Sequence, residues 1–460
     1  MVLYNRAKGK ALYVSRRTSI IPPPRIIKKT SAMQIHLAYG KSGLDVDIPD
    51  RNLLKVLEME EARSLGDPAG VLARALQEPL GGPPLASIAQ QARSACVVIC
   101  DITRPVPNTV LLPPLLKTLE EGGIDREQVT ILIATGLHRE STSDEVMTII
   151  GGAIKDRYAV RSHRARVLEE QTYLGETPNG SPVYIDKAYC SADLKITTGF
   201  IEPHLMAGFS GGRKLIAPGC AGEETIKALH SPKFIEHPEC REGSIDQNPL
   251  HRELLEIARM AGHDFLVNVT LDTRHAITGM FAGDPLVAHT AGIQHARQSV
   301  RATIPRKADI VVTTSAGYPL DLTLYQAVKG MTAALPIVKG GGMLLLVAEC
   351  AEGLGSHEFS EMATSFPSAD AFVDFISRNP VVIDQWQLEE CAKAARHAEV
   401  VLVSPVLSRR HGSDLFVKTA ETVEGALQAG WERLGPDASV AVIPKGPYTL
   451  VEVEVDPTSG

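Results

Sequence analysis

Short runs of apolar and β-branched residues recur along this chain, and segments with helical spacing separate them. The runs are ACVVICDI, QVTILIATG, ADLKITTGF, ADIVVTTSAG, GGMLLLVAE, EVVLVSPVL and SVAVIPKG, at residues 95–102, 128–136, 192–200, 308–317, 341–349, 399–407 and 439–446. Near-continuous apolar runs are typical of parallel strands buried on both faces. Segments 107–123 and 285–302 space apolar residues as sheet-covering helices do. The sequence therefore predicts an α/β fold with largely parallel sheets flanked by helices.

The chain is long enough for more than one domain. Its 460 residues, 44% of them hydrophobic, favour two or three domains. The charged helix end RQSVRATIPRKAD precedes a new series of strands, so we expect a domain change near residue 300. Residues 1–33 are basic, lack acidic residues and contain three consecutive prolines, so we interpret them as a disordered extension. A transit peptide is the alternative, but the prolines oppose its amphipathic helix.

The overall charge and the cysteines limit the classes of partner. A formal net charge of -7 provides no basic field for nucleic acid, so we expect small-molecule ligands instead. No apolar run approaches the roughly 18 residues of a membrane span, so we expect no membrane partner. The seven cysteines are scattered and form no disulfide framework, which predicts a cytoplasmic protein.

Polar turns follow several of the predicted strands. These turns are Asp101 to Arg104, Thr135 to Arg139, Thr197 to His204 and Ser315 to Asp321. Ligands of open α/β sheets bind outside the carboxyl ends of strands, so four turns could form one site. Arg104 can bind a carboxylate or phosphate through two hydrogen bonds, and Asp101 can orient it. His138 suits acid/base chemistry near neutral pH, although each residue alone could be a structural turn residue.

The stretch GFIEPHLMAGFSGGRKLIAPG, at residues 199–219, combines a histidine, glycines and an Arg-Lys pair. Its glycines could direct backbone N–H groups at an anion, although it matches neither a Walker A loop nor GxGxxG. The alternative is a glycine-rich turn with solvated basic side chains. Lys214 could also act as a nucleophile if apolar neighbours keep its amine partly neutral. GEETIKALH predicts a short helix that ends at His230, where a cap or surface role is the default.

Two further segments lie in the second half of the chain. Gln326 and Lys329 are three residues apart on a predicted helix, so they share one face and could hold a carboxylate. A solvated helix edge is the alternative for this pair. Trp386 lies in DQWQ, and core packing is its default interpretation.

Together these segments resemble the nickel-dependent lactate racemase family. DITRPVP, ATGLHR, the glycine stretch, a histidine sixteen residues after Lys214, YQAVKG and DQWQ follow the order found in that family. The resemblance extends from about Met33 to the C-terminus. It implies a racemase or epimerase of 2-hydroxy acids, with lactate as the default substrate and larger or sugar acids left open.

The resemblance also implies a cofactor, the nickel-pincer nucleotide Ni(II)-pyridinium-3,5-bisthiocarboxylic acid mononucleotide. By motif, Lys214 would carry it covalently and His230 would be the protein ligand of nickel. The other implied roles are cofactor contact for Asp101, Ile102, Thr103 and Arg104, acid/base catalysis for His138 and His204, and substrate contact for Arg104, Gln326 and Lys329. Trp386 receives no catalytic role. Cofactor-synthesis proteins are implied partners, and assembly into a homo-oligomer stays open.

The resemblance further suggests how the domains divide. Residues 34–298, with a returning segment at about 438–460, would form an N-terminal α/β domain, and residues 299–437 a C-terminal α/β domain. The cofactor and the active site would lie in the cleft between them. A hydride route also makes chemical sense, because removing the α-proton would place negative charge beside an ionised carboxylate.

Two other classes of protein compete with this interpretation. An NAD-dependent 2-hydroxyacid dehydrogenase would share a carboxylate-binding site and a histidine base, but its Gly-rich strand-to-helix fingerprint is missing from the sequence. A non-catalytic phosphate- or nucleotide-binding protein could use the same glycine turn. A non-catalytic protein of this kind would not explain the two histidines, or the presence of Lys214 and His230 at their spacing.

Overall fold

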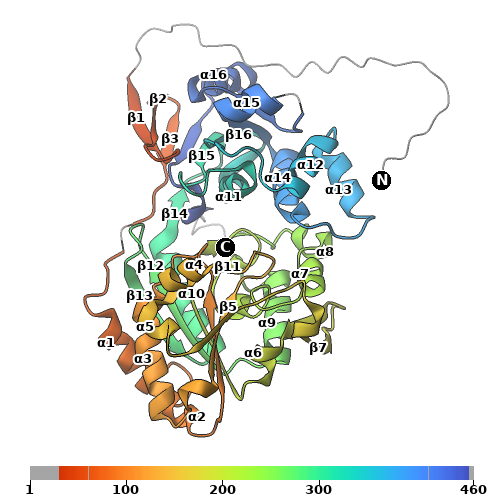
Figure 1. Ribbon diagram of the computed structural model, residues 1–460. Helices are drawn as coiled ribbons and strands as arrows, with labels where there is room; N and C mark the ends of the chain where they lie inside the picture. The colour runs from red at the N-terminus through yellow and green to blue at the C-terminus, as the bar shows by residue number, and fades with distance from the viewer. Residues whose placement is uncertain (1–30, 61, 413, 455–460) are drawn as a thin grey trace, which may run out of the picture.

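A computed structural model describes residues 31–60, 62–412 and 414–454 of the chain (Figure 1). The extension expected over residues 1–33 lies outside the described residues except for its last three. Strand β1 (Ala32–Leu37) already begins within it. No described helix is long and apolar enough to cross a membrane. All seven cysteines are free thiols.

The first large sheet has six strands and is parallel except at one edge. Its order is β13 (Ile277–Gly283), β12 (Phe265–Leu271), β9 (Leu194–Phe200), β4 (Ala95–Cys100), β5 (Val129–Ala134) and β6 (Ala159–Ser162). Only β12 and β13 are antiparallel. The runs predicted as strands at residues 95–102, 128–136 and 192–200 are therefore confirmed as its central strands.

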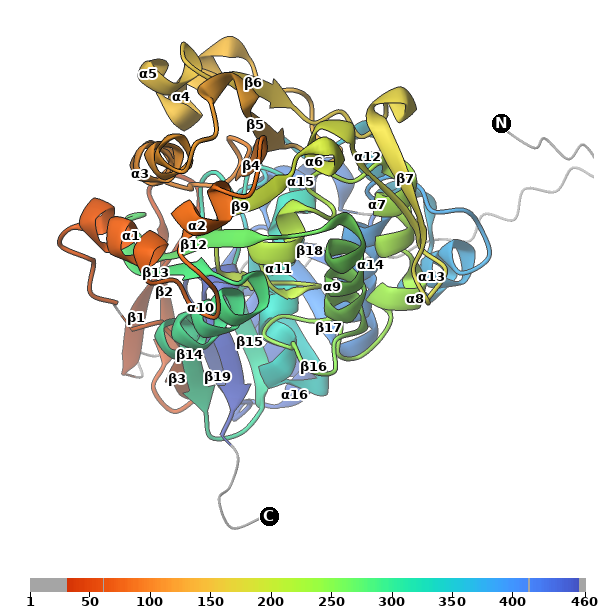
Figure 2. The same ribbon diagram turned by 90° about the horizontal axis from the view of Figure 1, so that it is seen from below.

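Helices cover both faces of this sheet, because alternate residues of each strand point to opposite sides. Val97 and Ile99 of β4 pack with one group of helices, whereas Cys96 and Val98 pack with another. The first group is α1 (Pro68–Gln77), α2 (Leu85–Ala89), α3 (Asn108–Glu121) and α4 (Ser143–Ile150), and the second is α6 (Lys187–Ser191), α7 (Glu223–Leu229) and α9 (Pro249–Ala261). Figure 2 shows these groups on either side of the sheet. Helices α5 (Gly152–Lys155) and α10 (Pro285–Val300) complete this half.

The second large sheet is entirely parallel. Its order is β18 (Lys418–Ala420), β17 (Glu399–Val403), β16 (Val338–Val347), β15 (Ala308–Thr314), β19 (Val440–Ile443) and β3 (Leu53–Val56). One face packs against α11 (Leu324–Ala334), α12 (His357–Ser365), α13 (Ala369–Ile376) and α14 (Gln385–His397). The other packs against α16 (Val423–Leu434) and the antiparallel pair of β1 with β2 (Leu44–Pro49). Helix α15 (Pro405–His411) follows β17.

Three short strand pairs and one short helix complete the α-helices and β-strands of the described residues. Two pairs are antiparallel, β7 (Gln171–Glu176) with β8 (Pro182–Asp186) and β10 (Pro203–His204) with β11 (Gly208–Phe209). The third pair, β14 (Arg301–Ile304) with β20 (Leu450–Val453), is parallel. Strand β14 directly follows α10, and β20 is the last strand of the described chain. Helix α8 (Pro232–Ile235) lies against α14 of the other half.

The strands near the two ends of the chain join a different sheet from the one that we expected. We expected residues 34–298 and 438–460 to form one domain. Strand β19, in the segment expected to return to the N-terminal half, pairs with β15 and β3 in the second sheet. The N-terminal strands β1 and β2 also pack on that sheet. In the second sheet β19 is buried on both faces between two parallel neighbours, as its continuous apolar run requires.

Candidate active site

A cavity of about 710 Å³ lies where elements of the two sheets meet. On one side it is lined by the turns that follow β4 and β5, by β9 and by the glycine stretch. On the other side it is lined by the start of α11, residues 352–358 and the start of α14. The predicted site residues that line it are Asp101, Thr103, Arg104, His138, His204, Lys214, His230 and Gln326.

Two predicted site residues lie elsewhere. Lys329 lines a smaller adjoining cavity of about 150 Å³, together with Thr103, Arg104 and His204. Ile102 lines neither cavity, and 42% of its surface is exposed. Its side chain therefore has no contact with either described space.

Three of the four strand-end turns converge on the main cavity as expected, and the fourth does not. The segment Ser315 to Asp321 reaches only the smaller cavity, through Leu320. Asp321 is fully buried, and its carboxylate accepts hydrogen bonds from the backbone of Gly40 at 2.7 Å and Glu349 at 3.3 Å. It connects β1 and β16 to this turn instead of facing a ligand.

His138 and Asp101 form a hydrogen-bonded pair at the mouth of the cavity. Nδ1 of His138 lies 2.7 Å from Oδ2 of Asp101, and 61% of the His138 side chain is exposed. Burial raises the pKa of Asp101, but hydrogen bonds from His138 and Thr103 outweigh it, so the pKa falls below its usual value. Because the carboxylate is an acceptor, Nδ1 carries the proton and Nε2 presents a lone pair.

His204 has the opposite hydrogen-bonding environment. Its Nδ1 accepts the backbone N–H groups of Met206 and Ala207, each at 3.2 Å. In the neutral ring the proton must therefore lie on Nε2. Burial lowers the pKa of His204 well below its usual value, and the cations of Lys214 and Arg104 lower it further. The two histidines thus present a lone pair and an N–H group, respectively.

Lys214 lies in a short 3₁₀ turn, Gly212–Leu215, at the end of the glycine stretch. Its amine makes no hydrogen bond or ion pair with any residue that the structure describes. Burial lowers its pKa to about 7, with further lowering by Arg213 and Arg104. A large fraction of this amine is consequently neutral and nucleophilic at pH 7.

His230 follows the last residue of α7, as the sequence predicts. Its Nδ1 donates a hydrogen bond of 2.8 Å to the backbone oxygen of Ile226, which leaves Nε2 with its lone pair free. Burial lowers its pKa to about 4, so the ring is neutral at pH 7. Trp386 packs on this ring with centroids 4.6 Å apart. A neutral ring whose N–H is held by a carbonyl is the usual state of a metal-ligating histidine.

Trp386 is the site residue that sequence reasoning missed. Its side chain is 8% exposed and belongs to a core cluster, as its default interpretation predicts, yet it also lines the cavity beside His230. Tyr325 lines the same wall. Only the motif DQWQ pointed to this residue in the sequence. The contact between Trp386 and His230 joins segments far apart in the chain, so local patterns could not predict it.

Gln326 and Lys329 lie on α11 and face the junction of the two cavities. Nζ of Lys329 donates a hydrogen bond of 2.7 Å to Oε1 of Gln326. Burial lowers the pKa of Lys329 to about 8, and Arg104 contributes to the shift. The Arg104 guanidinium makes no side-chain hydrogen bond or ion pair within the described part of the chain. This clustering of cations suits an anionic ligand.

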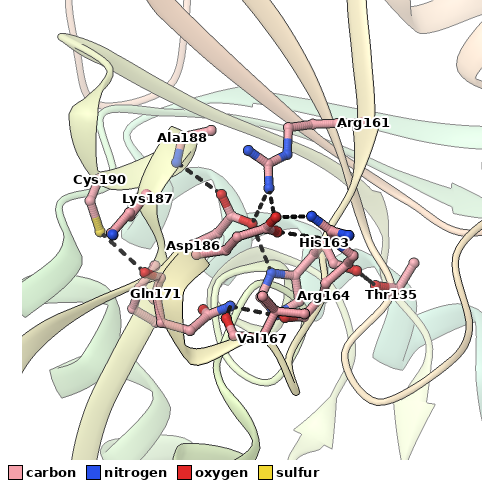
Figure 3. A network of polar contacts seen from close by, with 12 residues as sticks. Thr135, Arg161, His163, Arg164, Val167, Gln171, Asp186, Lys187, Ala188 and Cys190 are labelled. Atoms are coloured by element: carbon pink, nitrogen blue, oxygen red, sulfur yellow. Dashed lines mark hydrogen bonds and ion pairs between the residues drawn. The ribbon is translucent and has the colours of Figure 1, made fainter.

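A buried network supports the loops around the cavity (Figure 3). His163 contacts Asp186 through Nδ1 and the backbone oxygen of Ala221 through Nε2, both at 2.9 Å. The hydroxyl of Thr135 donates to the backbone oxygen of His163 at 2.6 Å. Both ring partners are hydrogen-bond acceptors, and the His163 side chain is fully buried between them. It connects β5, β8 and the chain after Lys214.

The site residues are compatible with the cofactor that the resemblance implies. The amine of Lys214 is buried and has no partner among the described residues, as a covalent attachment point requires. The free Nε2 of neutral His230 is a suitable nickel ligand. Both side chains line one cavity, which is large enough for a mononucleotide-sized ligand.

Comparisons with known sequences agree with one another. Residues 39–243 match the family model described as the lactate racemase N-terminal domain, and residues 304–451 match the lactate racemase C-terminal domain. A lactate racemase of Thermoanaerobacterium thermosaccharolyticum is 34% identical over 423 residues. One of Lactiplantibacillus plantarum is 34% identical over 425 residues. Each alignment covers 91% of this chain and 99% of the relative.

Solved structures support the same relationship. The fold resembles the lactate racemase apoprotein of T. thermosaccharolyticum with a TM-score of 0.86 and 33% identity, covering 91% of this chain and 100% of that one. A crystal structure from Thermotoga maritima shares the fold alone, with a TM-score of 0.62 and 17% identity, covering 86% and 100% of the two chains. The two family matches together extend over most of the chain, and so does the alignment with each relative, so this chain belongs to the lactate racemase family and is an isomerase.

Proposed function

We propose that this chain interconverts the stereoisomers of a 2-hydroxy acid, with lactate as the default substrate. The observation that carries the proposal is the pair of histidines that line one cavity in opposite hydrogen-bonding states. A racemase must reach the hydroxyl group in two orientations, so it needs a proton-transferring group for each. His138 and His204 are the two groups that we assign to this role.

The substrate carboxylate would bind at the cation cluster. Arg104 offers a planar guanidinium that can bind a carboxylate through two hydrogen bonds, and Lys329 adds a second positive charge. Gln326 already orients Lys329 through their hydrogen bond of 2.7 Å. A carboxylate held by these three side chains would place C2 between the walls that carry His138 and His204.

The same cavity would hold the nickel-pincer nucleotide. Lys214 would carry it covalently, His230 would ligate the nickel through Nε2, and Asp101, Thr103 and Arg104 of the turn after β4 would contact it. When bound, this group would supply a ring carbon that accepts the hydride from C2 and returns it. Packing of Trp386 on His230 would fix the orientation of that ligand ring.

The proton steps belong to the chain's own residues. Nε2 of His138 removes the hydroxyl proton, and its Nδ1–H stays bound to Asp101, whose negative charge stabilises the imidazolium that forms. Loss of the proton and of the C2 hydride leaves a planar 2-keto acid. When this product turns its other face and the hydride returns to C2, Nε2–H of His204 would donate the proton to the oxygen and so form the opposite stereoisomer. Proton exchange with solvent would then restore both histidines. The interdomain location of the cavity would exclude water while the keto acid is present.

We also propose the setting in which this enzyme works. Two domains would divide the chain, each built on one of the six-stranded sheets, with the active site in the cleft between them. Separate cofactor-synthesis proteins would have to load the chain before it is active. The seven free thiols favour the cytoplasm, where such groups stay reduced.

Intact mass spectrometry of chain made together with cofactor-synthesis proteins tests the proposal. We expect an added mass on the native chain and on the control variant Lys117→Ala, whose side chain is 74% exposed. We expect no added mass on Lys214→Ala. Chiral chromatography should then show interconversion of D- and L-lactate only by the two loaded proteins. An added mass that persists in Lys214→Ala would contradict the tether.

A further inference from the structure

A small second cavity adjoins the place where the substrate would bind. It measures about 150 Å³, and its boundary with the main cavity is shared by Thr103, Arg104, Phe200 and His204. Lys329 lines the small cavity, whereas its hydrogen-bonded partner Gln326 lines the main one. Carboxylate-binding and acid/base side chains therefore stand at the entrance of the small cavity.

The walls of this small cavity are mainly apolar. Its apolar side chains include Met59, Ile201, Leu205, Leu271, Val300 and Leu320. Burial raises the pKa of Glu242 to about 8, so its carboxyl group is largely protonated at pH 7. Burial also raises the pKa of Glu202 above its usual value, although Arg104 and Lys329 oppose the shift. A charged substituent would have to give up its hydration against these walls. A neutral Glu242 offers no opposite charge to a cationic substituent, and an anionic one would find Arg104 and Lys329 already bound to the substrate carboxylate.

We propose that the small cavity receives the C2 substituent of the substrate, and that this chain prefers 2-hydroxy acids whose substituent is uncharged, mainly apolar and larger than methyl. The inference rests on the proposed function, because it places the carboxylate and hydroxyl at Arg104, Lys329 and His204.

The size of the cavity supports this preference. An apolar cavity of about 150 Å³ is large enough to bind benzene. The methyl group of lactate would leave most of such a space unfilled, and its apolar walls would lose contacts that a larger group makes. A branched four-carbon chain would use the space without displacing Arg104 or His204.

An access route for substrate is the competing interpretation. Met59, Leu271, Asp272, Thr273 and Val300 line both the small cavity and an outer one of about 240 Å³. A substrate could therefore enter through the outer cavity. If the small cavity is an access route, narrowing its end next to the outer cavity would slow turnover of every substrate alike. If the small cavity holds the C2 substituent, the same change would slow turnover of the larger substrates only.

The test compares kcat/KM of the loaded enzyme for lactate, 2-hydroxy-4-methylpentanoate and malate. We expect about tenfold or greater preference for 2-hydroxy-4-methylpentanoate over lactate, since each added methylene in a fitted pocket gives a factor of about ten or more. Malate, with its charged substituent, should be the poorest substrate. Equal or higher kcat/KM for lactate would overturn the inference and leave the proposed function intact.

Two variants on α10 separate the competing interpretations. Val300→Phe narrows the far end of the small cavity and should lower kcat/KM for 2-hydroxy-4-methylpentanoate about tenfold with little change for lactate. Val287→Phe, on the same helix, is the control, because Val287 is 46% exposed and lines neither cavity. An equal loss for both substrates in Val300→Phe would overturn the inference in favour of an access route.

A binding measurement keeps the inference independent of turnover. Calorimetric titration of the purified chain should show tighter binding of 2-hydroxy-4-methylpentanoate than of lactate, and Val300→Phe should remove the difference. If the loaded enzyme interconverts none of the three acids, the proposed function fails, and this titration still decides what the cavity binds. Equal affinity for the two acids would overturn the inference.

Discussion

Two histidines that look equivalent in the sequence differ in their hydrogen bonds. Nδ1 of His138 donates to a carboxylate, whereas Nδ1 of His204 accepts two backbone N–H groups. At rest, Nε2 of His138 can accept a proton and Nε2 of His204 already holds one. The two stereoisomers should therefore not react equally fast in the first half of the reaction.

Acid-quenched single turnovers of the loaded enzyme test this difference. Formation of 2-keto acid should be slower for the stereoisomer whose hydroxyl faces His204, because that ring must first move its proton from Nε2. His138→Gln should lose keto acid formation from one stereoisomer and His204→Gln from the other. Either variant should abolish overall racemisation in both directions, since each direction uses both residues. If both variants lost keto acid formation from the same stereoisomer, the assignment of one histidine to each stereoisomer would be contradicted.

Asp101 determines which nitrogen of His138 is free. Asp101→Asn should lower kcat about 10- to 100-fold, because the lost negative charge weakens a charge-assisted hydrogen bond worth about 1.5–3 kcal/mol. The pKa of Asp101 lies below its usual value, so the carboxylate stays charged when the pH falls to the usual pKa of an aspartate. Steady-state kinetics check the effect, and an unchanged mass of the loaded variant is the control for cofactor attachment. A variant that keeps native kcat would exclude a role for the pair.

At the scale of one element, the glycine stretch determines where Lys214 lies. Gly211 has φ of 78°, and a Cβ there would come within 2.5 Å of Oδ1 of Asn268 and 3.0 Å of the backbone oxygen of Phe200. The same Asn268 oxygen accepts the backbone N–H of Gly212 at 2.9 Å. Only glycine allows this backbone to pass so close to β9 and β12.

Gly211→Ala should therefore lower the free energy of unfolding by about 3 kcal/mol or more, and reduce cofactor loading on Lys214. Gly341→Ala is the matched control. Gly341 has φ of 73°, and no described atom lies within 4 Å of the position that an added Cβ would take, so this variant should cost only about 1–2 kcal/mol. Urea unfolding measures both changes. Equal costs for the two variants would show that the contact with Asn268 does not matter.

At the scale of the whole molecule, buried charges join the two halves. Glu389 and Glu390 of α14 are buried, and Lys393 of the same helix donates to the backbone oxygens of Ile235 at 3.0 Å and Cys240 at 3.1 Å. Lys393 also pairs with Glu390 at 3.1 Å. The contact between α14 and α8 therefore depends on groups that can titrate.

Burial raises the pKa of Glu389 to about 9, with contributions from Glu236 and Glu390, against an ordinary value of 4.5. Between these values the folded chain holds a proton that the unfolded chain loses, so stability should fall as the pH rises from about 5 to 9. Glu389→Gln should remove at least about 1 kcal/mol of this fall. Thermal unfolding across this pH range measures it. The exposed control Glu127→Gln should follow the native chain, and an unchanged slope in Glu389→Gln would contradict the assignment.

Much of the local structure could be predicted from the sequence. The apolar runs became the strands β4, β5, β9, β15, β16, β17 and β19, and the predicted helices became α3 and α10. A capping box of Thr142 and Glu145 begins α4. These features depend on neighbouring residues, so periodicity and capping chemistry suffice to predict them.

The sequence by itself determined the α/β class and the family, and it indicated eight of the residues that line the main cavity. The tertiary structure decided that β3 and β19 join the second sheet, that Trp386 packs on His230, and that Lys329 lines the smaller cavity. It also decided the opposite hydrogen bonds of His138 and His204. Periodicity records which residues of a segment are buried, whereas strand partners, ring contacts and cavities depend on residues distant in the chain.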